Sequence, residues 1–168
     1  YLDGGGSLLL SSQDYLWDVG RTPFNAAYLQ IRDFTDNILN VHSVQGASGN
    51  PFFGQVMLYP LAPITNFTDW VIPLPAAMPA FESFDGTPAS PFPSALNYDS
   101  GTSKLLFLAW PLENLLQPVG PDAVIAAAAN WMGVPRTPTA GFTYSPALVC
   151  SGSPVILTGS TSTPAGNL

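Results

Sequence analysis

A short apolar run near the start of the chain, Leu8 to Leu10 between serines, predicts a strand that is buried on both faces. The segment before it, Tyr-Leu-Asp-Gly-Gly-Gly, carries the glycines that typically close a helix, so it indicates the last turn of a helix whose body is missing. We therefore expect the chain to begin inside an α/β unit, with Tyr1 a processing or proteolysis point.

The pattern after this strand predicts a helix and another strand. Thr22 suits a helix N-cap and Pro23 the first helical position, and Ala27, Tyr28 and Ile31 would then share one helix face. Residues 41–44 alternate apolar and polar, which is typical of a short strand. The order strand, loop, helix, strand indicates the α/β class.

Regular structure is interrupted between residues 46 and 93, where nine prolines occur, and returns after it. We expect an irregular excursion there, with a short strand near residues 80–84. Residues 96–102 predict a hairpin whose turn is Asp-Ser-Gly, followed by a strand over residues 104–110. A helix is predicted from Pro121 to Gly133, and its apolar stripe comprises Val124, Ile125, Ala128, Trp131 and Met132.

The composition changes sharply after Gly133. Twenty of the last 35 residues are Ser, Thr, Pro or Gly, and Arg136 is the only charged residue among them. The sequence thus predicts a partial α/β domain over residues 1–133, a linker over 134–140 and a β-strand tail over 141–168. Two short strands cannot bury a core alone, so the tail is expected to come from an incomplete β-sandwich and to pair with something else.

Charge is scarce in this chain and restricts its partners. Only 9% of residues are charged, 46% are hydrophobic, and the net charge is −7. An acidic chain repels phosphate backbones, which argues against nucleic-acid binding, and no apolar stretch is long enough to insert into a membrane. Low charge with many Ser, Thr, Gly and Pro is typical of secreted surface and filament-forming proteins; alternatively, a missing half of the domain covers the apolar surface.

Two segments carry a resemblance to a known family. The stretch from Gly5 to Asp18, followed by Thr-Pro-Phe, resembles the glutamine-amidotransferase-like or ThuA-like domain of large secreted bacterial surface proteins and extracellular peptidases. The hairpin at residues 97–101 and the segment Phe-Leu-Ala-Trp-Pro-Leu-Glu at 107–113 resemble the late hairpin and last turn of that domain. The tail resembles the opening strands of a PKD-type β-sandwich repeat. The resemblance implies the C-terminal part of a flavodoxin-like three-layer sandwich in an extracellular or cell-surface protein.

The residues that could carry catalysis are few. Enzymes related to this family use a cysteine with a histidine and an acid nearby, but Cys150 lies in the tail and His42 in the α/β part. We predict no catalytic residue and no cofactor. Asp14 and Asp18 follow the first strand at a spacing that would suit a calcium-type oxygen site, or they cap backbone amides in the loop.

Aromatic and polar residues in loops are candidates for an interface or a pocket. Trp17 and Trp70 are the better interface candidates, and Gln13, Asp14 and Trp110 are expected to line a pocket at the carboxyl ends of the strands. Asn66 begins an N-glycosylation sequon. The complete set of interface candidates is Gln13, Tyr15, Trp17, Trp70, Trp110, Phe142, Tyr144, Val155 and Leu157.

Two functions are compatible with these observations. The first is a non-catalytic structural segment that assembles with the rest of its precursor or with other copies of itself, in a filament or a surface layer, by adding a tail strand to a neighbouring sheet. The second is an accessory or ligand-binding domain of a secreted peptidase or glycan-active enzyme. Both place the chain outside the cell, and the first predicts a homo-oligomer or polymer.

Overall fold

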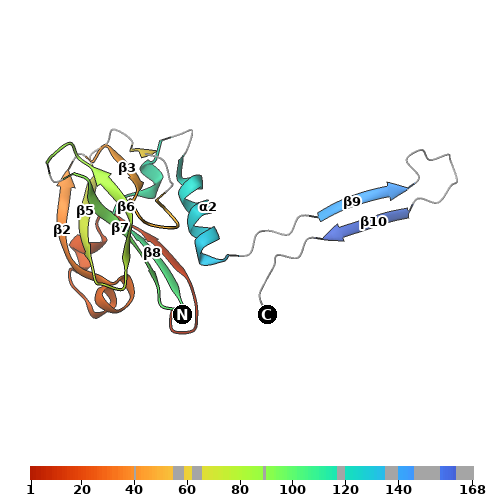
Figure 1. Cartoon of the computed structure of the whole chain (residues 1–168), viewed down its shortest axis with the longest axis horizontal. Helices are drawn as coiled ribbons and strands as arrows, with labels where there is room; N and C mark the ends of the chain where they lie inside the picture. The colour runs from red at the N-terminus through yellow and green to blue at the C-terminus, as the bar shows by residue number, and fades with distance from the viewer. Residues whose placement is uncertain are drawn as a thin grey trace. The chain divides into compact units, whose positions relative to one another are not determined.

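The structure of the chain is a computed structural model that describes residues 1–39, 41–54, 59–61, 66–88, 90–116, 120–134, 140–145 and 156–161. The chain divides into two compact units, Tyr1–Met132 and Gly133–Leu168 (Figure 1). The first unit is a mixed α/β domain, and the predicted change at Gly133 coincides with the boundary between the units.

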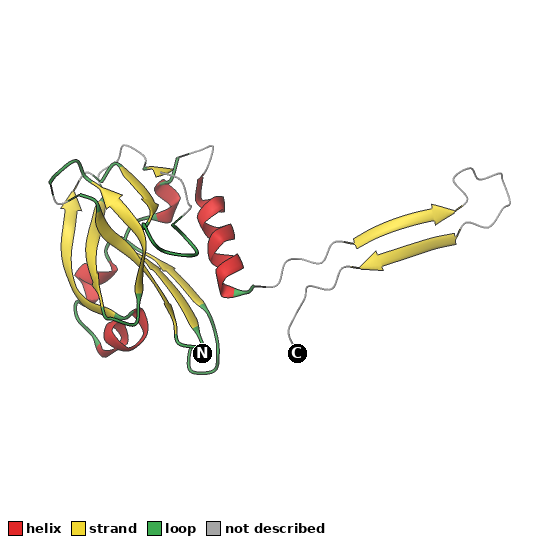
Figure 2. Ribbon diagram, viewed as in Figure 1, coloured by secondary structure: helices red, strands yellow, loops and turns green. Residues whose placement is uncertain are grey.

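A six-stranded sheet forms the centre of the first unit, in the order β1-β8-β7-β6-β3-β4 (Figure 2). The bounds of these strands are β1 Leu8–Ser11, β3 Ser43–Gly46, β4 Tyr59–Pro60, β6 Met78–Phe84, β7 Phe92–Asp99 and β8 Lys104–Leu108. The β1–β8 pair is parallel, with Leu8 opposite Leu105, and the other pairs in this sheet are antiparallel.

Alternate residues of the sheet belong to two separate hydrophobic clusters. On β8, Leu106 lies in one cluster and Phe107 in the other, as the two-residue period of a strand requires. The first cluster includes Val124, Ala128 and Trp131 of helix α2 (Gly120–Met132). The predicted apolar stripe of this helix is confirmed for these three side chains, which are buried, and for Met132, which is partly buried against the same cluster. It is wrong for Ile125, which is 47% exposed.

The second cluster is covered by short helices and a second sheet. Helix α1 (Tyr15–Val19) contributes Leu16, and the π-helical turn η1 (Asn25–Leu29) contributes Leu29. Strands β2 (Ile31–Leu39) and β5 (Phe67–Pro73) form an antiparallel two-stranded sheet. A short 3-10 helix, η2 (Leu112–Asn114), follows β8.

The helix predicted from Thr22 begins as expected, with helical structure from Pro23 and the Thr22 hydroxyl accepting a hydrogen bond from the amide of Asn25 at 3.2 Å, but it ends early, at Leu29. The chain makes one π-helical turn and leaves it at Gln30, whose φ of 56° is left-handed, so that Ile31 begins β2 instead of joining the helix face. The expected face of Ala27, Tyr28 and Ile31 is therefore wrong. Ile31 is buried, as its apolar side chain suggested, but as the first residue of strand β2 and not as part of a helix.

Two other expectations about strands are corrected. The sequence predicted Leu8 to Ser11 as an interior strand, but β1 lies at the end of the sheet order and all four of its residues are half-buried. In the proline-rich region 46–93, the short strand expected near residues 80–84 is confirmed as β6, but the rest is less irregular than expected, because it also contains β5 and the start of β7. The β6–β7 ladder tolerates Pro79 next to a register shift, where regular pairing is already interrupted.

The second unit contains the two predicted tail strands. Strand β9 (Ala140–Ser145) pairs antiparallel with β10 (Ile156–Thr161), with Tyr144 opposite Leu157 and Phe142 opposite Gly159. The two strands pair with each other, so the backbone groups along one edge of each strand are hydrogen-bonded within the chain. Val155 lies outside the described residues. In the described part of the chain, no helix has the length and hydropathy needed to cross a membrane.

Candidate functional site

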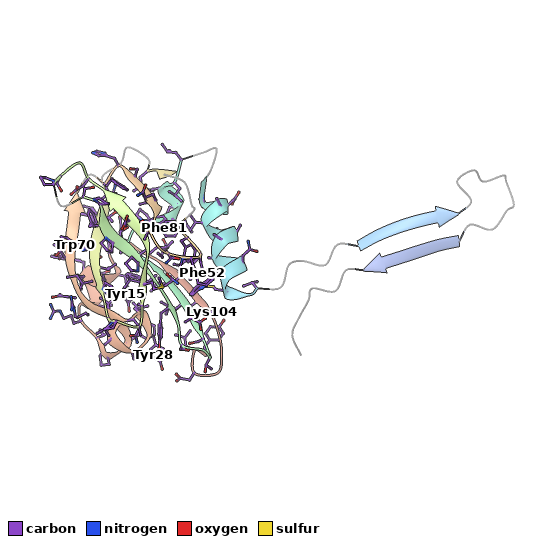
Figure 3. The ribbon with its side chains drawn as sticks, in the orientation of Figure 1. Tyr15, Tyr28, Phe52, Trp70, Phe81 and Lys104 are labelled. Carbon is purple, nitrogen blue, oxygen red and sulfur yellow. The ribbon has the colours of Figure 1, made fainter. Side chains whose placement is uncertain are left out.

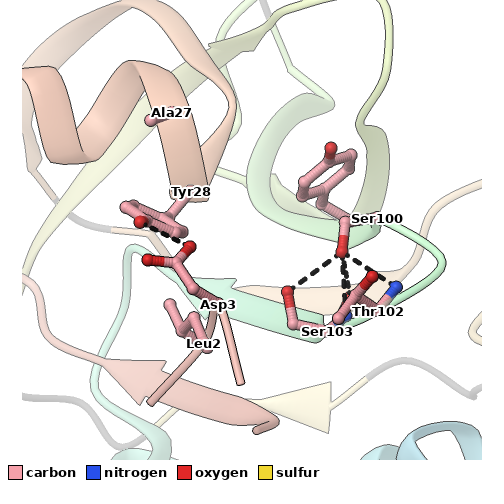
Figure 4. Close-up of a pocket in the computed structure, with 8 residues that line it drawn as sticks. Leu2, Asp3, Ala27, Tyr28, Ser100, Thr102 and Ser103 are labelled. Atoms are coloured by element: carbon pink, nitrogen blue, oxygen red, sulfur yellow. Dashed lines mark hydrogen bonds between the residues drawn. The ribbon is translucent and has the colours of Figure 1, made fainter. Parts of the chain in front are cut away.

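Two adjoining cavities lie where β1 and β8 begin, and they share Leu2, Asp3 and Tyr28. One has a volume of about 260 Å³ and a polar wall, and the other has a volume of about 340 Å³ and a mainly apolar wall. The polar cavity is lined by Leu2, Asp3, Ala27, Tyr28, Tyr98, Ser100, Thr102 and Ser103 (Figure 4). The apolar cavity is lined by Tyr1, Leu2, Asp3, Leu8, Phe24 and Tyr28.

The first wall of this site is the N-terminal turn, residues 1–6. The carbonyl of Tyr1 accepts hydrogen bonds from the amides of Gly4 and Gly6, at 3.2 and 3.1 Å. Gly5 has a φ of 88°, a conformation that favours glycine. The Tyr1 hydroxyl donates to the carbonyl of Ser7 at 3.0 Å. The amide of Gly5 also donates to the carbonyl of Leu2 at 3.0 Å. Together with the Gly6 to Tyr1 bond and the left-handed Gly5, this is the hydrogen-bond pattern that closes a helix, so the predicted helix-end turn is present and leads into β1.

The second wall of the site is η1, which one side-chain hydrogen bond joins to the N-terminal turn. The hydroxyl of Tyr28 donates to Oδ1 of Asp3 at 2.8 Å (Figure 4). This hydrogen bond, with the negative charge of Asp3 and some desolvation, raises the pKa of the Tyr28 phenol above its ordinary value of 10.0. The bond ties η1 to the N-terminal turn.

The third wall is the tight turn between β7 and β8. Its hydroxyl Ser100 Oγ accepts from the amide of Ser103 at 2.8 Å and from that of Thr102 at 3.2 Å, and the amide of Gly101 donates to Asp99 Oδ1 at 2.8 Å. The predicted Asp-Ser-Gly turn is thus confirmed. These bonds hold three hydroxyl-bearing residues at the rim of the polar cavity (Figure 4).

The chemistry that this site offers is hydrogen bonding and apolar contact. Its lining residues provide hydroxyls, one carboxylate and aromatic rings, and they include no histidine, cysteine or lysine. Hydroxyls and a carboxylate suit the binding of a neutral or basic group.

The pocket predicted at the other ends of the strands is not formed by the residues expected there. Trp110 is fully buried, with its ring 5.8 Å from that of Phe81, so it cannot line an open pocket. Gln13 is half-buried and accepts a hydrogen bond from the amide of Phe67 at 3.2 Å. Gln13 therefore holds its loop to the first residue of β5, and Trp110 is part of the hydrophobic core.

The other aromatic candidates differ in exposure. Trp17 on α1 is 63% exposed, as an interface residue would be. Tyr15 is directed inward, because its hydroxyl donates to Asn25 Oδ1 at 2.8 Å and its ring meets Phe107 edge-on (Figure 3). Trp70 is half-buried with its ring 5.9 Å from that of Phe92. Of these, only Trp17 presents most of its surface to solvent.

The structure argues against a glycan on Asn66. This side chain is 1% exposed, its amide donates to the carbonyl of Val41 at 2.9 Å, and its Oδ1 accepts from the hydroxyl of Thr68 at 3.0 Å. A glycan on that nitrogen would have to occupy the packed interior. The sequon residues Asn66 and Thr68 instead bond to each other.

The acidic candidates Asp14 and Asp18 lie at α1, whereas His42 lies in another segment, just before β3. Asp14 and Asp18 are exposed on successive turns at α1, and the amide of Asp18 donates to the carbonyl of Asp14 at 2.9 Å. Within the described ranges, no group of three or more His, Cys, Asp or Glu side chains gathers as a metal site would require. His42 is an exposed residue just before β3, and Cys150 lies outside the described residues.

Several residues of the site were not identified from the sequence. Leu2, Asp3 and Tyr28 are brought together by the turn, by η1 and by β1, and no motif connects them. The only signal was indirect: Tyr28 was expected on an apolar helix face, which indicated burial but not its hydrogen bond to Asp3.

Searches for relatives were negative on all three levels. No family model matches the chain, and no curated protein and no solved structure is significantly similar to it.

Proposed function

We propose that this chain is a non-catalytic structural segment of an extracellular protein, which assembles with other polypeptide through the edges of its sheets. In this proposal the first unit is the C-terminal part of a flavodoxin-type domain of the amidotransferase-like family. The parallel β1–β8 pair and the helix α2 packed beside it support that assignment. The charge scarcity of the sequence supports an extracellular location.

One observation carries the proposal, namely the position of β1. Leu9 packs into the cluster with α2, while Leu8 and Leu10 pack into the other cluster, so β1 is covered on both faces. Strands of this kind normally lie in the interior of a sheet. In the part of the chain that the structure describes, however, β8 is the only strand that pairs with β1.

The tail supports the same proposal. A two-stranded hairpin is marginally stable in water without a further layer to pack on. The β9–β10 pair is a separate unit, and each strand has an outer edge that no other described strand pairs with. We therefore extend the donor-strand hypothesis to the hairpin: its outer edge adds to a neighbouring subunit in a filament or surface layer.

A cross-linking experiment on the native protein tests the proposal. Asp3 and Asp14 are exposed and lie in sequence on either side of β1, so a carbodiimide, which joins a carboxylate directly to a neighbouring amine, would capture a polypeptide bound along this edge. We expect intermolecular cross-links at both residues and few at the exposed control Asp122 at the start of α2. Cross-links equally distributed over all three residues would contradict an assembly through β1.

The polar cavity favours a second candidate function, an accessory domain that binds a ligand of a secreted peptidase or glycan-active enzyme. Its hydroxyls and the Tyr28 ring are groups that commonly contact sugars. NMR titration with soluble oligosaccharides of glucose and of N-acetylglucosamine tests it. Shifts confined to Thr102 and Ser103 would support ligand binding, and unchanged spectra at millimolar sugar would argue against it.

A further inference from the structure

The outer edge of β1 has backbone groups that are available for pairing. The amide of Ser12 donates to the carbonyl of Leu108 at 3.0 Å, so Ser12 faces β8. Backbone groups alternate sides along a strand. The backbone N–H and C=O groups of Leu8 and Leu10 therefore also point to β8, while the amides of Leu9 and Ser11 point to the opposite edge of β1. No described residue accepts a hydrogen bond from these two amides.

This edge lacks the features that normally prevent strand addition. Exposed edges in natural proteins are usually protected by charged residues, prolines or bulges. The sequence from Ser7 to Ser12 has no charge and no proline, and the β1–β8 register runs without a shift. The β6–β7 pair, in contrast, carries two register shifts in the interior of the same sheet.

An apolar cavity lies where β1 begins. The cavity of about 340 Å³ is lined by Leu8 of β1 together with Leu2, Phe24 and Tyr28. Phe24 is 37% exposed, and its ring lies 5.2 Å from that of Tyr28. In strand addition, backbone pairing supplies affinity and pockets for alternate side chains supply specificity. A strand added next to β1 would bring a side chain to this cavity.

The charges near β1 are negative at both ends. Asp3 precedes the strand and Asp14 follows it, and both are exposed. Among the described residues neither has a cationic partner within ion-pair distance; Arg21 pairs with Asp33, and Lys104 lies 3.8 Å from Asp99 while it donates to the carbonyl of Trp131. This arrangement attracts a strand with basic ends and disfavours a second copy of this acidic chain.

We propose that the β1 edge binds an extended segment of a separate polypeptide, apolar at alternate positions and basic at both ends, with one apolar side chain in the cavity of Leu2, Leu8, Phe24 and Tyr28. This inference rests on the proposed function and names the partner that β1 accepts. Leu9 and Ser11 supply the backbone hydrogen bonds, and Asp3 and Asp14 attract the basic ends.

The test uses the full chain and a synthetic peptide, Lys-Thr-Val-Thr-Leu-Thr-Val-Thr-Lys, labelled with fluorescein. Its sequence reads the same in both directions, so it presents the same side chains to β1 in either orientation. We expect saturable binding by fluorescence anisotropy. Replacing Val and Leu by Ser should weaken it at least about tenfold, since burying one aliphatic side chain has that effect or more. Replacing both Lys by Glu should also weaken it.

Backbone pairing has its own signature in this experiment. A peptide N-methylated at residues 3, 5 and 7 and another N-methylated at residues 4 and 6 block opposite edges of the added strand. We expect one to lose binding and the other to retain it, and we expect hydrogen exchange at the amides of Leu9 and Ser11 to slow when the unmodified peptide binds. Equal binding of both methylated peptides would overturn strand addition.

Protein variants test the cavity. Phe24→Ser should weaken peptide binding about tenfold, whereas the control Phe52→Ser should not, because Phe52 is similarly exposed but lies against Trp131. Equal effects of the two variants would overturn the role of the cavity. If the amides of Leu9 and Ser11 are already protected by pairing between copies, the stated partner is wrong and the proposed function stands. If no peptide binds and native cross-links also miss β1, both proposals fail.

Discussion

The side chain of Asn50 makes four hydrogen bonds in the interior of the first unit, and its removal should destabilise the fold. Its amide nitrogen donates to the carbonyl of Pro79 and to Asn97 Oδ1, both at 2.7 Å. Its oxygen accepts from the amides of Phe52 and Phe53, both at 3.0 Å. Asn50 is 5% exposed, so water cannot replace these partners freely.

The expected loss in the free energy of unfolding follows from the four hydrogen-bonding groups that Asn50→Ala would leave without their partner. Each typical hydrogen bond contributes about 0.5–1.5 kcal/mol, and a buried group left without a partner costs about 1–3 kcal/mol. Asn97 and the amide of Phe53 are buried, while the other two partners are partly buried. We therefore expect a loss of about 3–5 kcal/mol in the free energy of unfolding, a large fraction of the total stability of an ordinary domain.

Urea unfolding followed by tryptophan fluorescence measures this loss. The control is Glu113→Ala, an exposed change that should stay within about 0.5 kcal/mol of the parent. If Asn50→Ala does not fold, Asn50→Ser, which retains a smaller hydrogen-bonding group, gives a measurable intermediate value. A loss below about 1 kcal/mol for Asn50→Ala, with an unchanged m-value, would refute the reasoning that this network holds the loop before Phe53 to β6 and β7.

Three further predictions follow from single contacts. Gly46→Ala should prevent native packing, because a Cβ there would lie 1.6 Å from the carbonyl oxygen of Phe53; circular dichroism with a melting curve measures this, and a parent-like melting temperature would contradict it. Asp3→Asn should lower the pKa of Tyr28 measured by NMR of ¹³C-labelled tyrosine. Because the pKa of Tyr28 is raised in the folded state, its hydrogen bond to Asp3 contributes fully to the unfolding free energy below about pH 10. That contribution is lost as the pH rises through the higher folded-state pKa. An unchanged pKa of Tyr28 in Asp3→Asn would show that Asp3 does not raise it. Trp17→Ser should change the unfolding free energy by less than about 0.5 kcal/mol, and a larger loss would show that Trp17 belongs to the core.

Elements with a strong local signal were predictable from the sequence. The apolar run of β1, the Asp-Ser-Gly turn and the striped helix α2 were each predicted within about one to three residues. In all three, the local pattern and the tertiary contacts agree. The Leu8 to Leu10 run also predicted burial on both faces; both clusters contact β1, but its residues are only half-buried.

Elements that depend on distant partners were not predictable. Strand β2 contains Arg32, Asp33 and Asp36 among its first residues, so its pattern does not resemble a buried strand, and it forms by pairing with β5. The prolines at 79 and 93 indicated loops, yet an extended ladder accommodates both.

The candidate site was missed for a related reason. Its walls come from three segments, and the link between Asp3 and Tyr28 joins residues 25 positions apart. Asn50 had no recognisable motif either, because its four partners lie on three different segments. Hydrogen bonds of this kind are specified by the complete fold and not by spacing along the chain.

The parallel pairing of β1 with β8 also has a consequence for biosynthesis. Leu8 pairs with Leu105, so β1 leaves the ribosome roughly 100 residues before its partner does. At translation rates of about 5–20 residues per second, this apolar strand waits about 5–20 s without its native neighbour. The nascent chain therefore exposes three consecutive leucines during that interval, and apolar segments exposed in this way are prone to aggregate before folding is complete.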